Sequence, residues 1–251
     1  MPAGYMGRIL YVDLTSGQWE IRPLDMAAAR AFLGGMGLNA WLMNGLYRPG
    51  TPALSPDNPI ILGAGPLVGT GVPGAAKLVA TTRFPLNGTV SESVGSMRFA
   101  LNLKKAGFEH AVITGRSREP VLLQIQDGGA ALLDAGDLWG LDIADTTDAL
   151  KSSEHGRGSS VTAIGPAGEN GVVFSIALVD KASTLGRGGL AAVMGSKNLK
   201  AVIARGRERP DIHDEEGLKA FLAGFRDRLK RFKNHPRVLK LGIMENWENY
   251  V

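Results

Sequence analysis

Two pairs of matching segments recur in the same order along this chain, and they constrain its fold more than any single motif does. Segment 61–69 (ILGAGPLVG) resembles segment 162–170 (TAIGPAGEN), with the shared prolines 100 positions apart. Segment 109–116 resembles segment 199–207, with the shared Ala-Val-Ile runs 90 positions apart. The matches predict two related halves within residues 60–207, arranged about a pseudo-two-fold axis. The alternative is chance similarity between glycine- and alanine-rich strand ends.

A glycine-rich turn that carries an arginine opens the run 186–203. A short helix of small apolar residues follows it, and a buried strand is expected at 200–204. Glycines let backbone N–H groups approach a ligand closely, and the N-terminus of the following helix favours negative charge. Arg187 adds a cation suited to phosphate or carboxylate. The run therefore predicts an anion-binding corner. A tight turn whose arginine only caps neighbouring carbonyls fits the pattern equally well.

Composition excludes several classes of site. The chain has 251 residues and no cysteine, which excludes disulfides, a cysteine-held iron–sulfur cluster and a thiol nucleophile within it. Its four histidines are scattered, without a second ligand at metal-binding spacing, so no zinc site is expected. No nucleophile–base pair or carboxylate dyad is evident, and we predict no catalytic residue.

The sequence lacks the features of a membrane or secreted protein. No apolar run reaches the length of a membrane span, and residues 1–10 lack a basic region followed by an apolar core. We therefore expect a cytoplasmic protein with no membrane partner. The formal net charge is only +4, and the basic run 226–233 is interpreted as the solvated face of a helix. No nucleic-acid partner is expected, although such a run can also bind nucleic acid.

Hydrophobic periodicity and turn residues predict alternating strands and helices. A β-hairpin is expected over 7–22, followed by a glycine-interrupted helix over 26–46 that Asp25 caps. Further strands are expected at 59–63, 77–83, 110–114, 120–126, 130–133, 160–164, 172–179 and 200–204. Further helices are expected at 97–105, 145–154, 214–232 and 238–250.

Five motifs in order give the chain a specific resemblance. They are 59–70 (PIILGAGPLVGT), 84–88 (FPLNG), 103–108 (LKKAGF), 164–170 (IGPAGEN) and 186–203. Together they resemble the N-terminal domain of the aldehyde ferredoxin oxidoreductase family, the tungsten bis-pterin enzymes. The resemblance implies an α+β fold with two mixed β-sheets and flanking helices. It also implies a pterin-cofactor platform domain over 1–210, with 211–251 as the helical start of the following domain or a linker.

The resemblance implies a specific cofactor. In the family, two molybdopterins chelate one tungsten (or molybdenum), and a magnesium ion bridges their phosphates. By motif alignment, the backbone carbonyls that bind magnesium fall on Thr184 and on Val94, with Ser93 as the alternative to Val94. Carbonyl and phosphate oxygens are hard ligands of the kind that magnesium prefers. The implied cofactor-binding residues are Lys77, Ser93, Val94, Gly95, Ser183, Thr184, Leu185, Gly186, Arg187 and Gly188.

Two of these positions depart from the family pattern, which commonly has arginine at both. This chain has Lys77 and Ser183 there. Lysine keeps the charge but loses the bidentate geometry of a guanidinium, and serine loses the charge. The departures indicate a divergent branch and leave the substrate open. Elsewhere, Glu169 and Asn170 are interpreted as residues that fix a turn through side-chain hydrogen bonds, with ligand contact as the alternative.

The implied activity is oxidation of a small aldehyde to a carboxylic acid, with a ferredoxin-type electron acceptor. The family's 4Fe–4S cluster and its cysteines lie in later domains. We therefore expect the chain to be the incomplete N-terminal part of the enzyme, inactive alone and partnered by the remaining domains or subunits. A homo-oligomer is compatible with this interpretation. The alternatives are a stand-alone phosphate- or nucleotide-binding module and a non-catalytic assembly subunit.

Overall fold

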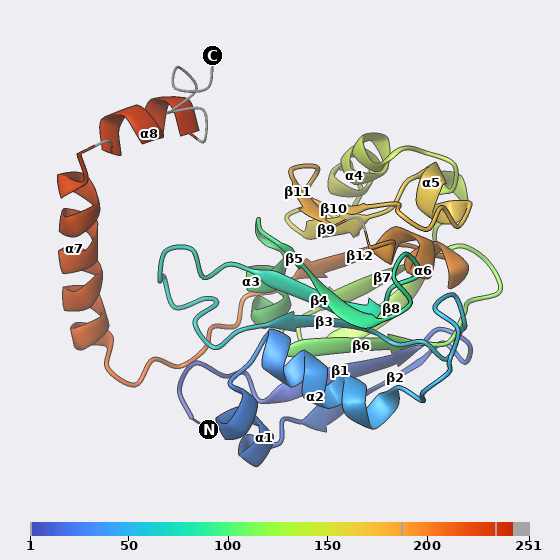
Figure 1. Cartoon of the computed structure of the whole chain (residues 1–251), viewed down its shortest axis with the longest axis horizontal. Helices are drawn as coiled ribbons and strands as arrows, with labels where there is room; N and C mark the ends of the chain where they lie inside the picture. The colour runs from blue at the N-terminus through green and yellow to red at the C-terminus, as the bar shows by residue number, and fades with distance from the viewer. Residues whose placement is uncertain (1, 187, 234, 243–251) are drawn as a thin grey trace. The chain divides into compact units, whose positions relative to one another are not determined.

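The computed structural model describes residues 2–186, 188–233 and 235–242 (Figure 1). The chain divides into two compact units, Met1–Asp211 and Ile212–Val251. The first unit contains two six-stranded sheets, and the second contains two helices.

The first sheet has the strand order β2-β1-β6-β3-β4-β5. Its strands are β1 (Arg8–Asp13), β2 (Gln18–Pro23), β3 (Ile60–Ala64), β4 (Leu78–Arg83), β5 (Val90–Gly95) and β6 (His110–Thr114). β1 and β6 are parallel, and the other neighbouring pairs are antiparallel. The sheet is therefore mixed, as the sequence resemblance implies, and β5 lies at one of its edges.

The second sheet has the strand order β11-β10-β9-β12-β7-β8. Its strands are β7 (Val121–Gln126), β8 (Gly129–Asp134), β9 (Ser160–Ala163), β10 (Ala177–Val179), β11 (Ser183–Leu185) and β12 (Leu199–Arg205). β7 and β12 are parallel, and the other neighbouring pairs are antiparallel. This sheet is also mixed, and β11 occupies the edge that corresponds to β5.

The two sheets repeat each other strand for strand, which confirms the duplicated halves. One row of paired residues crosses the first sheet through Ile9, His110, Gly63, Val79 and Val94. The matching row crosses the second sheet through Leu122, Ala201, Ala163, Leu178 and Thr184. The halves span 8–114 and 121–205, so the repeat is longer than the predicted 60–207 body, because β1 and β2 belong to the first half.

One of the two sequence matches is out of register with the structure. The proline match agrees with the strand pairing, because Gly63 and Ala163 hold equivalent places in their sheets. The Ala-Val-Ile match does not: Ala111 packs in the core between the sheets, whereas Ala201 packs on the outer face of the second sheet. A shift of one residue turns every side chain to the opposite face. The true equivalent of Ala201 is His110.

The main core lies between the two sheets, and separate clusters cover their outer faces. Helices α3 (Phe99–Lys105) and α6 (Leu190–Ser196) contribute Phe99, Leu103, Leu190 and Val193 to the main core. α1 (Met26–Phe32) and α2 (Met36–Leu46) pack on the first sheet, and α4 (Ile143–Ser152) packs on the second. Each fully buried large apolar side chain contributes roughly 1.5–3 kcal/mol.

Most predicted elements are present, with two differences, and residues 243–250 of the helix predicted over 238–250 lie outside the described residues. The glycine interruption predicted within 26–46 is confirmed, because the helix is broken at Gly35, whose φ of 48° falls in the left-handed region that favours glycine. Asp25 caps its first part as predicted, with Oδ1 accepting from Ala27 N at 2.7 Å. Strand β5, strand β11 and the short helix α5 (Pro166–Glu169) were not predicted. The strand predicted over 172–179 is confined to Ala177–Val179.

The second unit holds α7 (Glu215–Arg231) and α8 (His235–Leu241). Asp214 caps α7, because its Oδ1 accepts from Gly217 N at 2.8 Å. The basic residues between 226 and 233 are exposed, in agreement with a solvated helix face. No helix within the described residues has the length and apolar character needed to cross a membrane.

Candidate functional site

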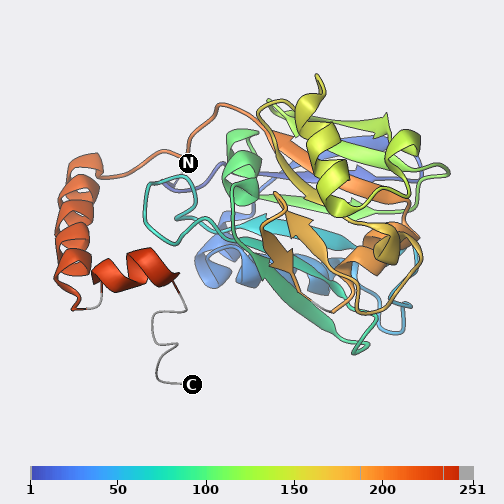
Figure 2. The same ribbon diagram turned by 90° about the horizontal axis from the view of Figure 1, so that it is seen from above.

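The junction between strands β5 and β11 brings the predicted site residues together from the two halves. These edge strands pack against each other (Figures 1 and 2). The fit is close: a Cβ added to Gly95 on β5 would lie 2.8 Å from Leu185 Cδ2 on β11. Glycine at position 95 therefore allows the two strands to approach, and the approach places Ser93 to Gly95 beside Ser183 to Gly186.

The two predicted carbonyl positions are equivalent under the internal repeat. Val94 ends the residue row of the first sheet, and Thr184 ends the matching row of the second. Both side chains are exposed on the outer faces of their sheets, and 46% of the Val94 surface is accessible to solvent. Edge strands leave alternate main-chain carbonyls without a partner in the sheet. The junction can therefore present two matched main-chain positions to one ligand.

Two serines contact the opposite half in a reciprocal arrangement. Ser93 and Ser183 occupy equivalent positions, each preceding one of the matched residues. Ser183 Oγ accepts a hydrogen bond from Ser96 N at 2.7 Å, and Ser93 Oγ lies against Gly186, where an added Cβ would come within 2.6 Å of it. Reciprocal contacts of this kind are typical of a two-fold interface. They fix the two edge strands relative to each other.

Lys77 is linked to this junction through Ser96. Lys77 immediately precedes β4, and its Nζ donates to Ser96 Oγ at 2.6 Å. Because Ser96 N donates to Ser183 Oγ, a chain of hydrogen bonds connects the two positions at which the sequence departs from its family pattern. Ser96 was not identified from the sequence, because its role depends on contacts 19 and 87 positions away.

The glycine-rich turn is enclosed by segments from both halves. A Cβ on Gly188 would lie 2.7 Å from Phe84 Cδ1, and Gly188 O accepts from Leu86 N at 3.3 Å. Gly189 has a φ of 94°, and a Cβ there would collide with the carbonyl oxygen of Val173. These glycines are required by close approach and backbone conformation. Arg187, the predicted anion-binding residue, lies outside the described residues.

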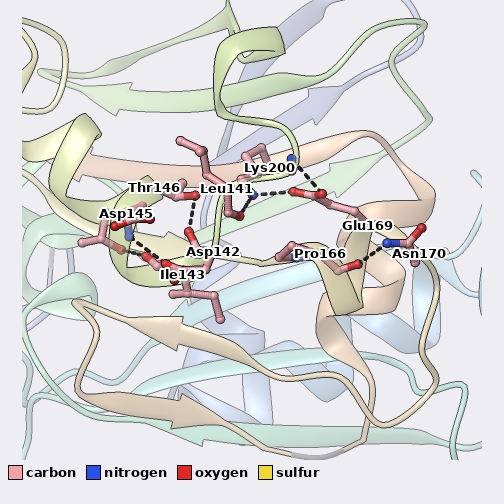
Figure 3. Close-up of polar contacts among 11 residues, drawn as sticks. Leu141, Asp142, Ile143, Asp145, Thr146, Pro166, Glu169, Asn170 and Lys200 are labelled. Atoms are coloured by element: carbon pink, nitrogen blue, oxygen red, sulfur yellow. Dashed lines mark hydrogen bonds and ion pairs between the residues drawn. The ribbon is translucent and has the colours of Figure 1, made fainter.

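Glu169 and Asn170 are occupied by internal contacts (Figure 3). Glu169 forms an ion pair with the buried Lys200, and its other oxygen accepts from Gly140 N at 2.9 Å. Lys200 Nζ also donates to Leu141 O at 2.7 Å, and Asn170 Nδ2 donates to Pro166 O at 2.8 Å. This arrangement agrees with the interpretation that these side chains fix a turn. In the sequence, a lysine within the otherwise apolar strand LKAVIA could have indicated a buried ion pair, although not its partner.

The first half carries a buried ion pair of opposite polarity at the equivalent place. Glu109 O accepts from Ala64 N, and Lys200 O accepts from Ile164 N, which makes Glu109 and Lys200 equivalent. Glu109 lies 3.6 Å from the ammonium of Lys104. Burial raises the pKa of Glu109 and lowers the pKa of Lys104, and each charge opposes the shift of the other. These pairs are internal to each half and are not part of the β5–β11 junction.

Among the described residues, side chains alone do not provide a metal site. Within 2–186, 188–233 and 235–242, no group of three histidine, cysteine, aspartate or glutamate residues could hold a metal ion. A cation at the β5–β11 junction would therefore need main-chain oxygens and oxygens of a bound ligand. Carbonyl and phosphate oxygens form such a donor set for magnesium.

Comparisons with known proteins agree in both sequence and structure. The sequence profile of "Aldehyde ferredoxin oxidoreductase, N-terminal domain" matches residues 9–206. A tungsten-containing aldehyde ferredoxin oxidoreductase from Pyrococcus abyssi is 34% identical over 233 residues, covering 93% of this chain and 38% of that protein. An aliphatic sulfonate oxidoreductase, WOR-like subunit, from Pyrococcus furiosus is 32% identical over 237 residues, covering 88% of this chain and 38% of that protein.

A solved structure shares the fold. The active-site complex BamBC of benzoyl coenzyme A reductase, in complex with 1,5-dienoyl-CoA, contains a chain that matches with a TM-score of 0.88 at 32% identity. The match covers 92% of this chain and 35% of that chain. The present chain therefore spans little more than a third of the length of the relatives described here.

Proposed function

The chain belongs to the aldehyde ferredoxin oxidoreductase family, as the N-terminal domain of a member, and we propose that this domain is the platform for a bis-pterin metal cofactor. The family membership confirms the resemblance seen in the sequence. It does not favour a stand-alone phosphate-binding module or a non-catalytic assembly subunit, because the matched relatives are named as oxidoreductases. We assign the platform to 1–210 and the start of a following domain, or a linker, to 211–251.

One observation carries the proposal: Val94 and Thr184 occupy equivalent places at the ends of matching residue rows. A cofactor made of two similar pterins has an approximate two-fold symmetry of its own. A duplicated fold can bind each half of such a ligand with an equivalent surface. The shared axis would lie at the β5–β11 junction, and the carbonyls of the matched residues would hold a magnesium ion between the two phosphates.

The residues at the junction fit this group. Val94 and Thr184 are exposed, so the outer faces of β5 and β11 are open to a ligand. Gly186 and Gly188 add no side chains there, and Lys77 supplies a cation for a phosphate oxygen. We infer that Ser93, Gly95, Ser183 and Leu185 shape and fix the two strands, and that Arg187 adds a second cation.

The bound metal would supply the two-electron chemistry, and this chain would bind and orient the cofactor. We propose tungsten, or molybdenum, as the metal, because four of the relatives are named as tungsten-containing. For the complete protein we propose oxidation of a small aldehyde to the acid with a ferredoxin-type acceptor. A 4Fe–4S cluster would lie in the domains or subunits that accompany this chain.

Elemental and pterin analysis of the protein, purified together with the polypeptides that accompany it, tests the platform. We expect tungsten or molybdenum with about two pterins per metal, the ratio that the duplicated halves imply. Bound nucleotide without metal would instead support a phosphate-binding module. A stable partner without any ligand would support an assembly subunit, and either result would overturn the proposal.

A further inference from the structure

Lys77 and Ser96 form a donor pair that the second half does not repeat. Leu78 pairs with Gly95, and Ala177 pairs with Leu185. The residues that flank these pairs are Lys77 and Ser96 in the first half, but Ile176 and Gly186 in the second. The first half therefore has an ammonium and a hydroxyl where the second half has an apolar side chain and no side chain.

The spacing of the two donors is suited to one anion. Lys77 Nζ and Ser96 Oγ lie 2.6 Å apart, so both can approach the same oxyanion group, as the paired nitrogens of a guanidinium do. Lys77 uses one of its three N–H donors on Ser96, which leaves two for a ligand. Ser96 Oγ accepts from Lys77, so its own proton remains a second, neighbouring donor.

The pair is also anchored to the opposite half. An exposed lysine on a flexible four-carbon stem samples many rotamers. Here the hydrogen bond to Ser96 restricts the ammonium, and Ser96 is itself held by Ser183 Oγ on β11. The donor pair is therefore fixed relative to both edge strands of the junction.

We propose that Lys77 and Ser96 together form a two-point clamp for one phosphate group, in which Ser96 donates its own proton and also positions the Lys77 ammonium. A single arginine at position 77 would supply two neighbouring donors to the phosphate, and here Lys77 and Ser96 supply one donor each. This inference rests on the proposed function, because the cofactor would supply the phosphate. Beyond the proposed function, the inference is that Ser96 determines how Lys77 binds the phosphate. It also follows that the two halves of the platform bind their phosphates differently.

Calorimetric titration of the 251-residue chain with inorganic pyrophosphate and magnesium tests the clamp. Ser96→Ala should weaken binding about tenfold, the worth of one charge-assisted hydrogen bond. Ser96→Thr keeps the hydroxyl and should bind like the unchanged chain. In a Lys77→Arg background, Ser96→Ala should cost less than about twofold, because the guanidinium carries its own second donor. Ser152→Ala, at an exposed serine of α4, is the matched control.

The outcomes separate the two proposals. A tenfold loss in the lysine background but not in the arginine background, at an unchanged unfolding temperature, supports the clamp. Equal losses in both backgrounds, or no loss in either, overturn the positioning role of Ser96 while leaving pyrophosphate binding at the platform intact. Failure of the unchanged chain to bind pyrophosphate overturns the clamp and counts against the platform as well.

Discussion

At the scale of single residues, three fully buried lysines distinguish this domain from an ordinary core. Lysine is almost never fully buried unless it is paired. Each of these ammonium groups donates to carbonyls of segments far away in the sequence: Lys104 to Gly4 O at 2.5 Å, Lys197 to Pro56 O at 2.7 Å and Gly115 O at 3.0 Å, and Lys200 to Leu141 O at 2.7 Å. The buried lysines thus act as cross-links between loops.

Lys197 should make stability depend on pH in the alkaline range. Burial lowers its pKa from 10.5 to about 8, so between these values the unfolded chain binds a proton that the folded chain lacks. Stability from this group therefore rises with pH from about 8 to 10.5, by roughly 3 kcal/mol at most. Neutral lysine still has two N–H donors for its two carbonyl partners. Lys197→Met should remove this rise in urea unfolding curves, and exposed Lys219→Met should not. Parallel pH profiles for Lys197→Met and the unchanged chain would contradict the assignment.

His110 should make the stability of the fold depend on pH in the acid range. Its Nδ1 lies 2.7 Å from Asn39 Oδ1, and burial lowers its pKa from 6.5 to about 3. Below pH 6.5 the unfolded chain gains a proton that the folded chain does not, so stability is lost as pH falls towards 3. NMR should show the His110 ring unprotonated at pH 5 in the folded protein, and His110→Gln should flatten this part of the stability profile. A His110 signal that titrates near pH 6.5 would rule the mechanism out.

At the scale of elements, the sequence predicts the mostly apolar strands and the edge strands β2 and β8, but it misses the two edge strands at the junction, β5 and β11. β3, β6 and β12 are mostly apolar and almost entirely buried, and each was expected close to its observed place. β5, with sequence VSESVG, and β11, with only three residues, lack an apolar pattern because they are edge strands beside a polar junction. The motif resemblance still predicts carbonyl ligands at Val94 and Thr184 on these two strands, and that role stays a prediction. It could not identify Ser96 or the ion-pair partner of Lys200, because these depend on tertiary contacts.

Replacing glycine by alanine should change the free energy of unfolding in opposite directions at two positions, depending on φ and on the space around the added Cβ. Gly189→Ala should lower the free energy of unfolding by roughly 2–4 kcal/mol, since the φ of 94° is strained for alanine and the added Cβ collides with Val173 O. Gly45→Ala, in α2 with nothing within 4 Å of the added Cβ, should raise it by about 1 kcal/mol. Chemical denaturation of the two variants measures the difference. A Gly189→Ala variant as stable as the unchanged chain would show that the α6 entry turn tolerates a side chain.

At the scale of the whole molecule, the duplicated fold explains how one chain can provide two equivalent surfaces for a two-lobed ligand. The halves share strand order and register, yet they differ in chemistry at the junction, where Lys77 and Ser96 are matched by Ile176 and Gly186. A duplication preserves backbone positions more strictly than side chains. Main-chain carbonyls can therefore remain equivalent while the side chains around them diverge, and on the proposed function this would make the platform symmetric in metal ligation but asymmetric in phosphate contacts.

The 251-residue chain alone should not oxidise aldehydes. The chain has no cysteine to hold a cluster that would pass electrons on, and it spans only 38% of the aldehyde ferredoxin oxidoreductase that it matches. A platform of this extent would leave one side of the proposed cofactor open to water, so the reacting centre would lack the enclosure that an active site needs. Chain produced with tungsten and pterin available should show no aldehyde oxidation above background with an artificial electron acceptor. A preparation that also contains the remaining domains or subunits is the positive control. Sustained turnover by this polypeptide alone, with metal bound, would show that the platform is a complete enzyme.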